Sequence, residues 1–127
     1  MLNHETGLLS VHGTAIAAEA IGRGEALPVK NYRLTSYGGY ESVGGRAMSQ
    51  KVLINRLTCS VCPVSCRRET AAMGVRSEGP DYAQISLLGT NCMLFNLEHI
   101  SYLTYLCYEM GLDPIESGDT LAVYAEF

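Results

Sequence analysis

Three cysteines within eight residues restrict what this chain can fold into more than any other feature. They stand in the segment Cys59-Ser-Val-Cys62-Pro-Val-Ser-Cys66. Two residues between the first pair and three between the second let one loop direct its thiols at neighbouring iron corners of an iron–sulfur cube. We therefore interpret Cys59, Cys62 and Cys66 as three ligands of a [4Fe-4S] cluster, and the chain as one part of a larger redox enzyme.

Zinc and a disulfide are the alternatives for these thiols. Structural zinc needs four ligands, usually as two separated pairs, and the chain has no second Cys-x-x-Cys and no His-x-x-x-His. An odd total of five cysteines, three of them crowded together, is not typical of a secreted disulfide framework. The spacing also reverses the Cys-x-x-x-Cys-x-x-Cys order of radical S-adenosylmethionine enzymes. A cluster is the favoured interpretation.

A cluster that only transfers electrons needs a fourth thiolate ligand. Cys107 falls on the apolar face of an expected helix, where a cysteine is usually a small buried hydrophobe. Cys92 follows Asn91 in an expected turn, where it can be either a fourth ligand or a packing residue. The chain ends at Phe127 inside a helical pattern with no C-terminal cap, so we expect a truncation there. A fourth cysteine beyond the truncation is an equal alternative.

Two arginines follow the cysteines directly. Arg67 and Arg68 either offset the negative charge of the thiolates or are simply solvated, and the sequence favours neither. His12 and His99 have no Cys, Asp or Glu at metal-ligand spacing, so we expect capping or surface roles for both.

Composition excludes some classes of partner. The formal net charge of −4 argues against nucleic-acid binding, which needs clustered Lys and Arg. No apolar run approaches the roughly 18–20 residues of a membrane span, and the start of the chain lacks the pattern of a signal peptide. With the cysteine pattern, these observations indicate the reducing cytoplasm. Hydrophobic residues make up 47% and charged residues 17%, which suggests surface that faces a partner or the rest of the polypeptide.

Hydrophobic periodicity predicts a mostly α fold, an irregular helical domain with long ordered loops that belongs to a larger multidomain enzyme. Residues 25–45 are rich in Gly and Tyr and lose the periodicity, which is typical of an ordered irregular segment. Asn96 is a good N-cap, and Asp113 or Ser117 opens a last helix. The other expected helices cover residues 5–21, 46–57, 81–89 and 97–110.

Three short motifs follow one another along the chain: Cys59-Ser-Val-Cys62-Pro-Val-Ser-Cys66, Gly79-Pro-Asp-Tyr-Ala83 and Tyr108-Glu-Met-Gly-Leu-Asp113. In order and separation they resemble Cys-x-x-Cys-Pro-x-x-Cys, Gly-Pro-Glu-Tyr-Glu and Asp-x-x-Gly-Leu-Asp of the tungsten-containing aldehyde:ferredoxin oxidoreductases. Further segments look like pieces of that family ahead of the cysteines: Gly13-Thr14, Ala26-Leu-Pro28 and Asn31-Tyr32. The resemblance therefore covers nearly the whole chain.

The resemblance implies an enzyme with an N-terminal β-rich domain and two helical domains, of which residues 1–127 would be most of the first helical domain. It implies a tungsten (or molybdenum) bis-pterin and a [4Fe-4S] cluster that passes electrons to ferredoxin. Cys59, Cys62 and Cys66 would be cluster ligands, with the fourth cysteine in the second helical domain. Tyr108 and Asp113 would contact the pterin. The implied activity is oxidation of aldehydes to carboxylic acids, in which this fragment alone would be inactive. Its partners would be the missing N- and C-terminal domains, with a homo-oligomer also compatible.

Two positions depart from the family pattern. Ala83 replaces a carboxylate proposed to act near the metal, and alanine cannot bind a proton. Tyr108 replaces an aspartate, so it can hydrogen-bond the pterin but brings no formal charge. Asp113 is the safer pterin contact, and an N-cap is its alternative role. These departures leave open a related enzyme such as the tungsten subunit of benzoyl-CoA reductases.

A stand-alone [4Fe-4S] electron-transfer module is the alternative from another class. It would need Cys92 or Cys107 as the fourth ligand and a capped helix after residue 121, which the sequence lacks. Molybdopterin enzymes of the dimethyl sulfoxide reductase type share the cysteine spacing with a distant fourth cysteine. Their motifs do not include Gly111-Leu-Asp113.

Overall fold

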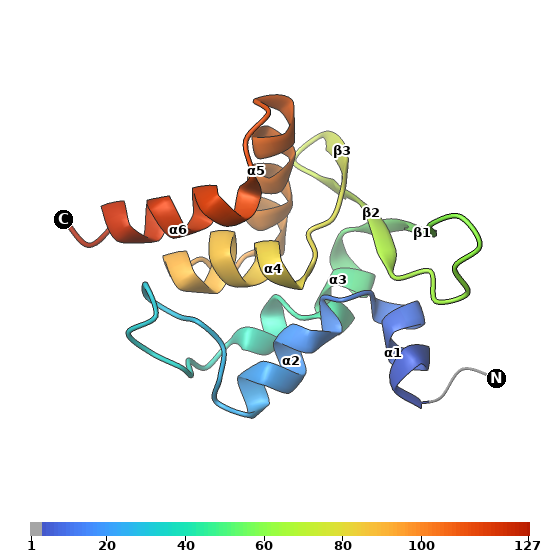
Figure 1. The fold of residues 1–127 in the computed structure, drawn as a ribbon, viewed down its shortest axis with the longest axis horizontal. Coiled ribbons are helices and arrows are strands. Elements are labelled where there is room, and N and C mark those ends of the chain that lie inside the picture. The colour runs from blue at the N-terminus through green and yellow to red at the C-terminus, as the bar shows by residue number, and fades with distance from the viewer. Residues whose placement is uncertain (1–3) are drawn as a thin grey trace.

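The computed structural model describes the backbone of residues 4–127 and the side chains of residues 7–127. Helices dominate this part of the chain, as the periodicity predicts, and one small antiparallel sheet accompanies them (Figure 1). The helices are α1 (His4–His12), α2 (Ile16–Arg23), α3 (Gly45–Lys51), α4 (Tyr82–Gln84), α5 (Leu97–Glu109) and α6 (Pro114–Tyr124). The strands are β1 (Leu53–Leu57), β2 (Arg67–Ala72) and β3 (Val75–Glu78). Short turns of tighter or wider helix complete the fold: η1 (Tyr40–Ser42), η2 (Ile85–Gly89) and η3 (Thr90–Cys92).

The helix expected over residues 5–21 is two helices. Gly13 separates them with a φ of 70°, in the left-handed region that ends α1. A Cβ at Gly13 would lie 3.0 Å from both the Arg68 Cγ and the Cys66 carbonyl oxygen. Glycine is required here because the start of the chain passes directly beneath the cysteine loop.

The helix expected over residues 46–57 is wrong in its second half. The helix α3 ends at Lys51, and β1 follows in antiparallel register with β2, from Leu53 opposite Thr70 to Leu57 opposite Arg67. Pairing with a distant strand overrides the local helical pattern, since a short apolar run fits both periods. The sheet as a whole was not predicted from the sequence.

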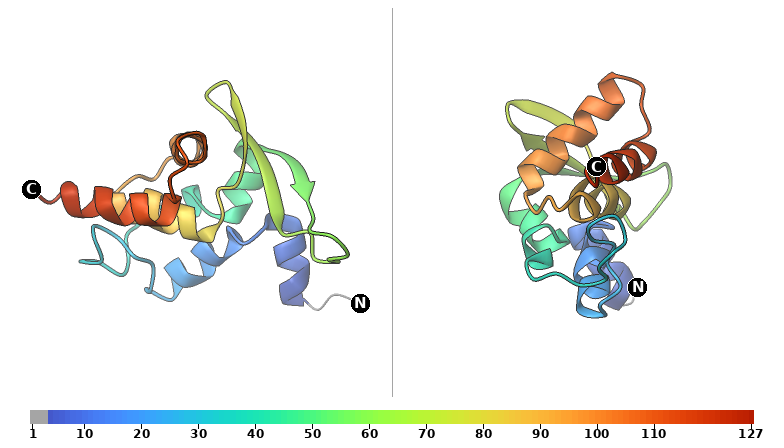
Figure 2. Two further views of the ribbon diagram at one scale, coloured as in Figure 1. Left: turned by 45° about the horizontal axis from the view of Figure 1, so that its top comes forward. Right: turned by 90° about the vertical axis from the view of Figure 1, so that its left-hand side faces the viewer.

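The helices α5 and α6 begin where the sequence places them. The Asn96 side chain accepts a hydrogen bond from the His99 backbone N–H at 3.0 Å and caps α5. The Asp113 side chain caps α6, and Pro114 occupies the first turn. The helix α5 packs against β2, β3, η2 and α6, and so joins the sheet to the C-terminal helices (Figure 2).

One hydrophobic core lies between α2, α3, the sheet and α5. Its buried members are small or aliphatic: Ala15, Ala18, Val43, Ala47, Met48, Val52, Ala72, Ile85, Leu97 and Ile100. The loop of residues 58–66, between β1 and β2, lies outside this core and projects from the end of the molecule opposite the C-terminus (Figure 1). None of the described helices is long and apolar enough to cross a membrane.

Candidate functional site

The three clustered cysteines occupy the β1–β2 loop. Thr58 Oγ1 donates to the Cys62 carbonyl at 2.8 Å, and the Cys62 backbone N–H donates to the Cys59 carbonyl at 3.1 Å. Val61 and Ser65 have positive φ values of 62° and 52°. The loop therefore turns sharply just before Cys62 and again just before Cys66. These contacts fold the loop into successive turns that carry all three thiols.

All three thiols are free, with Cys59 exposed and Cys62 and Cys66 half-buried. Among the side chains of residues 7–127, no three His, Cys, Asp or Glu groups lie close enough together to hold a metal ion. The structure places the three predicted ligands on one loop. Each thiolate of an iron–sulfur cube binds a different iron, so these ligands need not converge on one ion.

The two other cysteines take part in packing elsewhere. Cys92 Sγ donates to the carbonyls of Leu87 at 3.3 Å and Gly118 at 3.4 Å, which ties η3 to η2 and α6. Burial raises the pKa of the Cys92 thiol. Cys107 is buried on α5, as the helical pattern predicts. The raised pKa of Cys92 favours its neutral thiol over a metal-bound thiolate, and Cys107 is enclosed by the packing of α5.

The arginines after the cysteines have opposite environments. Arg67 forms a bidentate ion pair with Glu78 across the β2–β3 ladder. Glu78, and to a smaller extent Cys59, raise the pKa of Arg67. Arg68 is only 1% exposed, so its interpretation as a solvated residue is wrong. Burial lowers the pKa of Arg68, and no carboxylate among residues 7–127 forms an ion pair with it.

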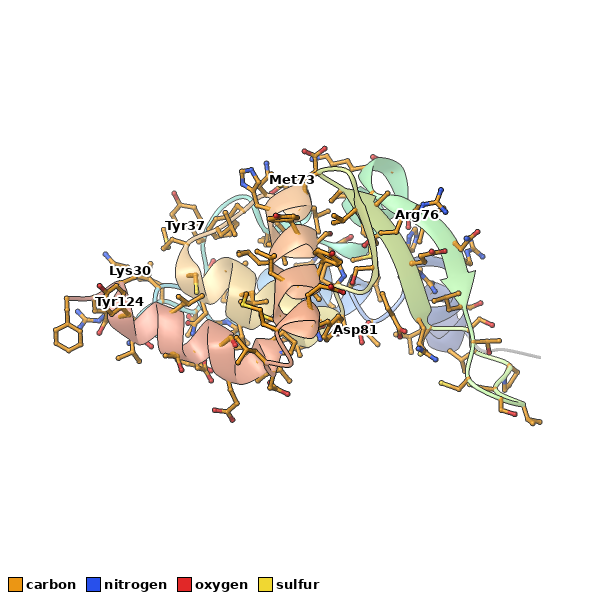
Figure 3. The ribbon with its side chains drawn as sticks, turned by 90° about the horizontal axis from the view of Figure 1, so that it is seen from above. Lys30, Tyr37, Met73, Arg76, Asp81 and Tyr124 are labelled. Carbon is orange, nitrogen blue, oxygen red and sulfur yellow. The ribbon has the colours of Figure 1, made fainter. Side chains whose placement is uncertain are left out.

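The Gly79-Pro-Asp motif connects the sheet to α4. Thr70 Oγ1 donates to the Gly79 carbonyl at 2.6 Å, and the Gly79–Pro80 peptide bond is cis. Asp81 caps α4 in a capping box in which its backbone N–H donates to Gln84 Oε1 at 2.7 Å. Thr14 Oγ1 donates to Asp81 Oδ1 at 3.1 Å. In the view from above, Asp81 is seen between α5 and the sheet (Figure 3).

Tyr108 lies next to this motif. Gln84 Nε2 donates to the Tyr108 hydroxyl at 3.4 Å, which links the second and third sequence motifs. Burial first, and then the negative charges of Asp81, Glu78 and Asp113, raise the pKa of Tyr108. The phenol is therefore neutral at physiological pH and can donate a hydrogen bond.

Asp113 is the N-cap of α6. Its Oδ1 accepts the backbone N–H groups of Ile115 at 2.8 Å and Glu116 at 3.0 Å. Because both bonds go to Oδ1, the exposed Oδ2 is left for another donor. The alternative role as a cap is confirmed, and it is compatible with a ligand contact.

Two polar side chains that connect the motifs were missed at the sequence level. They are Thr14, which bonds Asp81, and Gln84, which bonds Tyr108. The spacing Asp81-x-x-Gln84 is that of a capping box and would have identified Gln84. Thr14 acts across 67 residues, and no local pattern indicates such a contact.

Comparisons with known proteins match almost the whole chain. A family described as aldehyde ferredoxin oxidoreductase, domains 2 and 3, matches residues 2–127. A tungsten-containing aldehyde ferredoxin oxidoreductase of Pyrococcus furiosus is 35% identical over 121 residues, which are 94% of this chain and 20% of that protein. A protein with the same description from Thermococcus kodakarensis is 34% identical over 122 residues, again 94% and 20%.

A differently named relative matches the same region. An aliphatic sulfonate oxidoreductase, WOR-like subunit, of Pyrococcus furiosus is 31% identical over 121 aligned positions, and the match covers 90% of this chain and 19% of that protein. The chain thus spans about a fifth of the length of these relatives.

Proposed function

Because this chain belongs to the aldehyde ferredoxin oxidoreductase family, we propose that it is one part of a tungsten-pterin, [4Fe-4S]-containing oxidoreductase that oxidises aldehydes and passes electrons to ferredoxin. Residues 1–127 would form most of its first helical domain. The observation that carries this proposal is the loop of three free thiols, Cys59, Cys62 and Cys66, at one end of the molecule. Ferredoxin and the enzyme's other domains would be its partners in the cytoplasm.

The chemistry of the loop fits a cluster. Thiolates are the ligands that iron–sulfur clusters take, and this loop offers three of them with none engaged in a disulfide. Its exposure leaves room for a fourth thiolate from another part of the polypeptide. Cys92 and Cys107 are held in packing contacts, which argues against recruiting either one. When bound, the cluster supplies one-electron transfer.

The pterin would lie against Tyr108 and Asp113. Asp113 offers Oδ2 to the amino groups of a pterin, while its Oδ1 stays on the helix cap. Tyr108 offers a neutral hydroxyl that Gln84 orients. Conversion of an aldehyde and water to a carboxylic acid releases two protons and two electrons. Ala83 cannot accept either proton, so that task falls to a residue outside this position.

The test uses the full-length protein, isolated without oxygen. We expect it to contain tungsten or molybdenum and to reduce ferredoxin when an aldehyde is added, with the matching carboxylic acid as product. Absence of both metals from a folded preparation would contradict the proposal.

A different substrate is the second candidate. Ala83 and Tyr108 depart from the aldehyde-oxidising pattern, and one relative is named an aliphatic sulfonate oxidoreductase. Ferredoxin reduction that depends on an aliphatic sulfonate, and does not occur with a panel of short and aromatic aldehydes, would favour this candidate.

A further inference from the structure

Arg68 is a buried cation without a partner anion among the described side chains. It is 1% exposed, and the ion pairs formed by residues 7–127 do not include it. A charge removed from water in this way is costly unless an opposite charge lies nearby. Arg67, its neighbour in sequence, is instead neutralised by Glu78 at the surface. The net positive charge at the base of the loop therefore belongs to the buried Arg68 and to the exposed Arg56 opposite it.

The Arg68 guanidinium is held entirely by backbone carbonyls. Its Nη1 donates to Ser65 and Arg67 at 2.7 Å each, and its Nη2 donates to Leu9 at 3.0 Å and Ser10 at 2.7 Å. These carbonyls come from the cysteine loop and from the last turn of α1. The side chain thus fixes the end of the loop against the body of the protein through neutral acceptors. The Asp81 carboxylate acts on its charge without forming an ion pair.

Two further observations describe the surroundings of this charge, and the second places it beside the third cysteine. The Nε atom of Arg68 is buried and has no hydrogen-bond partner. The Gly13 Cα faces both the Arg68 side chain and the Cys66 carbonyl, because a Cβ there would lie 3.0 Å from each. Only a residue without a side chain allows the chain to pass so close. The packing brings the buried cation directly beneath the loop.

We propose that Arg68 is the internal counter-charge of the proposed cluster: it anchors the loop that ends at Cys66 and makes the cluster easier to reduce. This inference rests on the proposed function. Reduction adds one electron to the cluster, with no bond made or broken at Arg68 and no proton taken from it. The added negative charge is stabilised by a fixed cation in a low-dielectric site more than by an exposed one. Arg68 is thus a positioning residue that also sets the reduction potential.

The experiment is a reductive titration of the full-length protein, followed by electron paramagnetic resonance, with iron and sulfide measured on the same samples. For Arg68→Gln we expect the ratio of reduced to oxidised cluster at a fixed potential to fall about tenfold, a shift of about 59 mV to more negative potential for one electron. Arg68→Lys keeps the charge and should lie closer to the wild type than to Arg68→Gln.

Arg56 supplies the matched control. It is the residue opposite Arg68 in the β1–β2 ladder, and its side chain is exposed to solvent. Arg56→Gln removes the same charge, but water screens it, so the ratio should change less than about threefold. If Arg56→Gln shifts the reduction potential as much as Arg68→Gln does, the proposal that the buried cation acts more strongly than an exposed one is overturned.

The remaining outcomes are also decisive. A full complement of iron and sulfide in Arg68→Gln with an unchanged potential would overturn the proposal. If Arg68→Gln loses the cluster, retention of the cluster in Arg68→Lys would support the counter-charge role. Loss of the cluster from both variants would overturn that role and leave only the contacts of the guanidinium with the carbonyls. A wild-type protein without iron and sulfide would instead overturn the proposed function, which separates the two failures.

Discussion

At the scale of single residues, Asp113 combines a structural contact with a proposed ligand contact. Asn is about as good an N-cap as Asp, whereas Ala is much worse. We therefore expect Asp113→Asn to leave the unfolding free energy nearly unchanged and Asp113→Ala to lower it by about 1 kcal/mol. Both variants should lower the pterin content of the full-length protein, because neither retains the carboxylate. Pterin release on denaturation and a denaturant titration measure the two effects; full pterin content in both variants would remove Asp113 from the proposed site.

Residue types alone could not separate Arg67 from Arg68. Both follow the cysteines and both lie on β2, where successive side chains face opposite sides of the sheet. That alternation pairs Arg67 with Glu78 at the surface and buries Arg68, but it is visible only once β2 is known to be a strand. The spacing of Cys59, Cys62 and Cys66 predicts a shared role for them, whereas the environments of the two arginines depend on the strand.

At the scale of elements, replacing a helical glycine by alanine should have opposite effects on the unfolding free energy in α6 and in α1. In α6, a Cβ at Gly118 would lie 2.5 Å from the Leu87 carbonyl carbon and 2.7 Å from the Leu88 nitrogen, both backbone atoms. Gly118→Ala should therefore lower the unfolding free energy by about 1–3 kcal/mol. In α1, no other part of the described chain beyond the helix's own backbone comes within 4 Å of a Cβ at Gly7. Gly7→Ala should therefore raise the unfolding free energy by about 0.5–1 kcal/mol. Denaturant titration of both variants decides; equal effects would contradict the close approach of α6 to η2.

The contact between α1 and α3 predicts a pH dependence. His12 Nδ1 lies 3.0 Å from Ser49 Oγ, and burial, followed by the positive charge of Arg46, lowers the pKa of His12 from its usual 6.5. Below that value the unfolded chain binds a proton that the folded chain does not, so this contribution to stability is present above pH 6.5 and is lost as the pH falls. Asn in the variant His12→Asn can still hydrogen-bond Ser49 but does not titrate. The variant should therefore lose less stability than the wild type as the pH falls. Unfolding midpoints across this pH range test it, and an unchanged profile would exclude His12 as its source.

Helix ends were predictable because their signals are local. Asn96, Asp113 and Pro114 lie within a few residues of the turns that they cap or open, and α5 and α6 begin as expected. The sheet depends on pairing between β1 and a strand that starts ten residues beyond it, across the cysteine loop. Its β2–β3 turn at Met73-Gly74 has positive φ at both residues, a conformation that suits a two-residue hairpin but that Met73 does not announce in the sequence.

At the scale of the whole molecule, apolar surface is concentrated around α5 and α6. A groove of about 520 Å³ between α5 and α6 is lined largely by aliphatic side chains. Large side chains in α6 and in the turn between α5 and α6 are exposed: Met110, Leu112, Leu121, Val123 and Tyr124. The expectation from composition of surface that meets other protein is consistent with a chain that spans about a fifth of its relatives.

Cys59, Cys62 and Cys66 are proposed to hold three irons of one cluster. Its most direct test is the content of iron and acid-labile sulfide per polypeptide in the full-length protein, isolated without oxygen and checked for folding by gel filtration. The wild type should contain about four of each, and Cys→Ala at any of the three positions should remove most of both. Cys92→Ala and Cys107→Ala should retain them. Full iron and sulfide in the variants of the loop, or their loss only from Cys92→Ala or Cys107→Ala, would contradict the account.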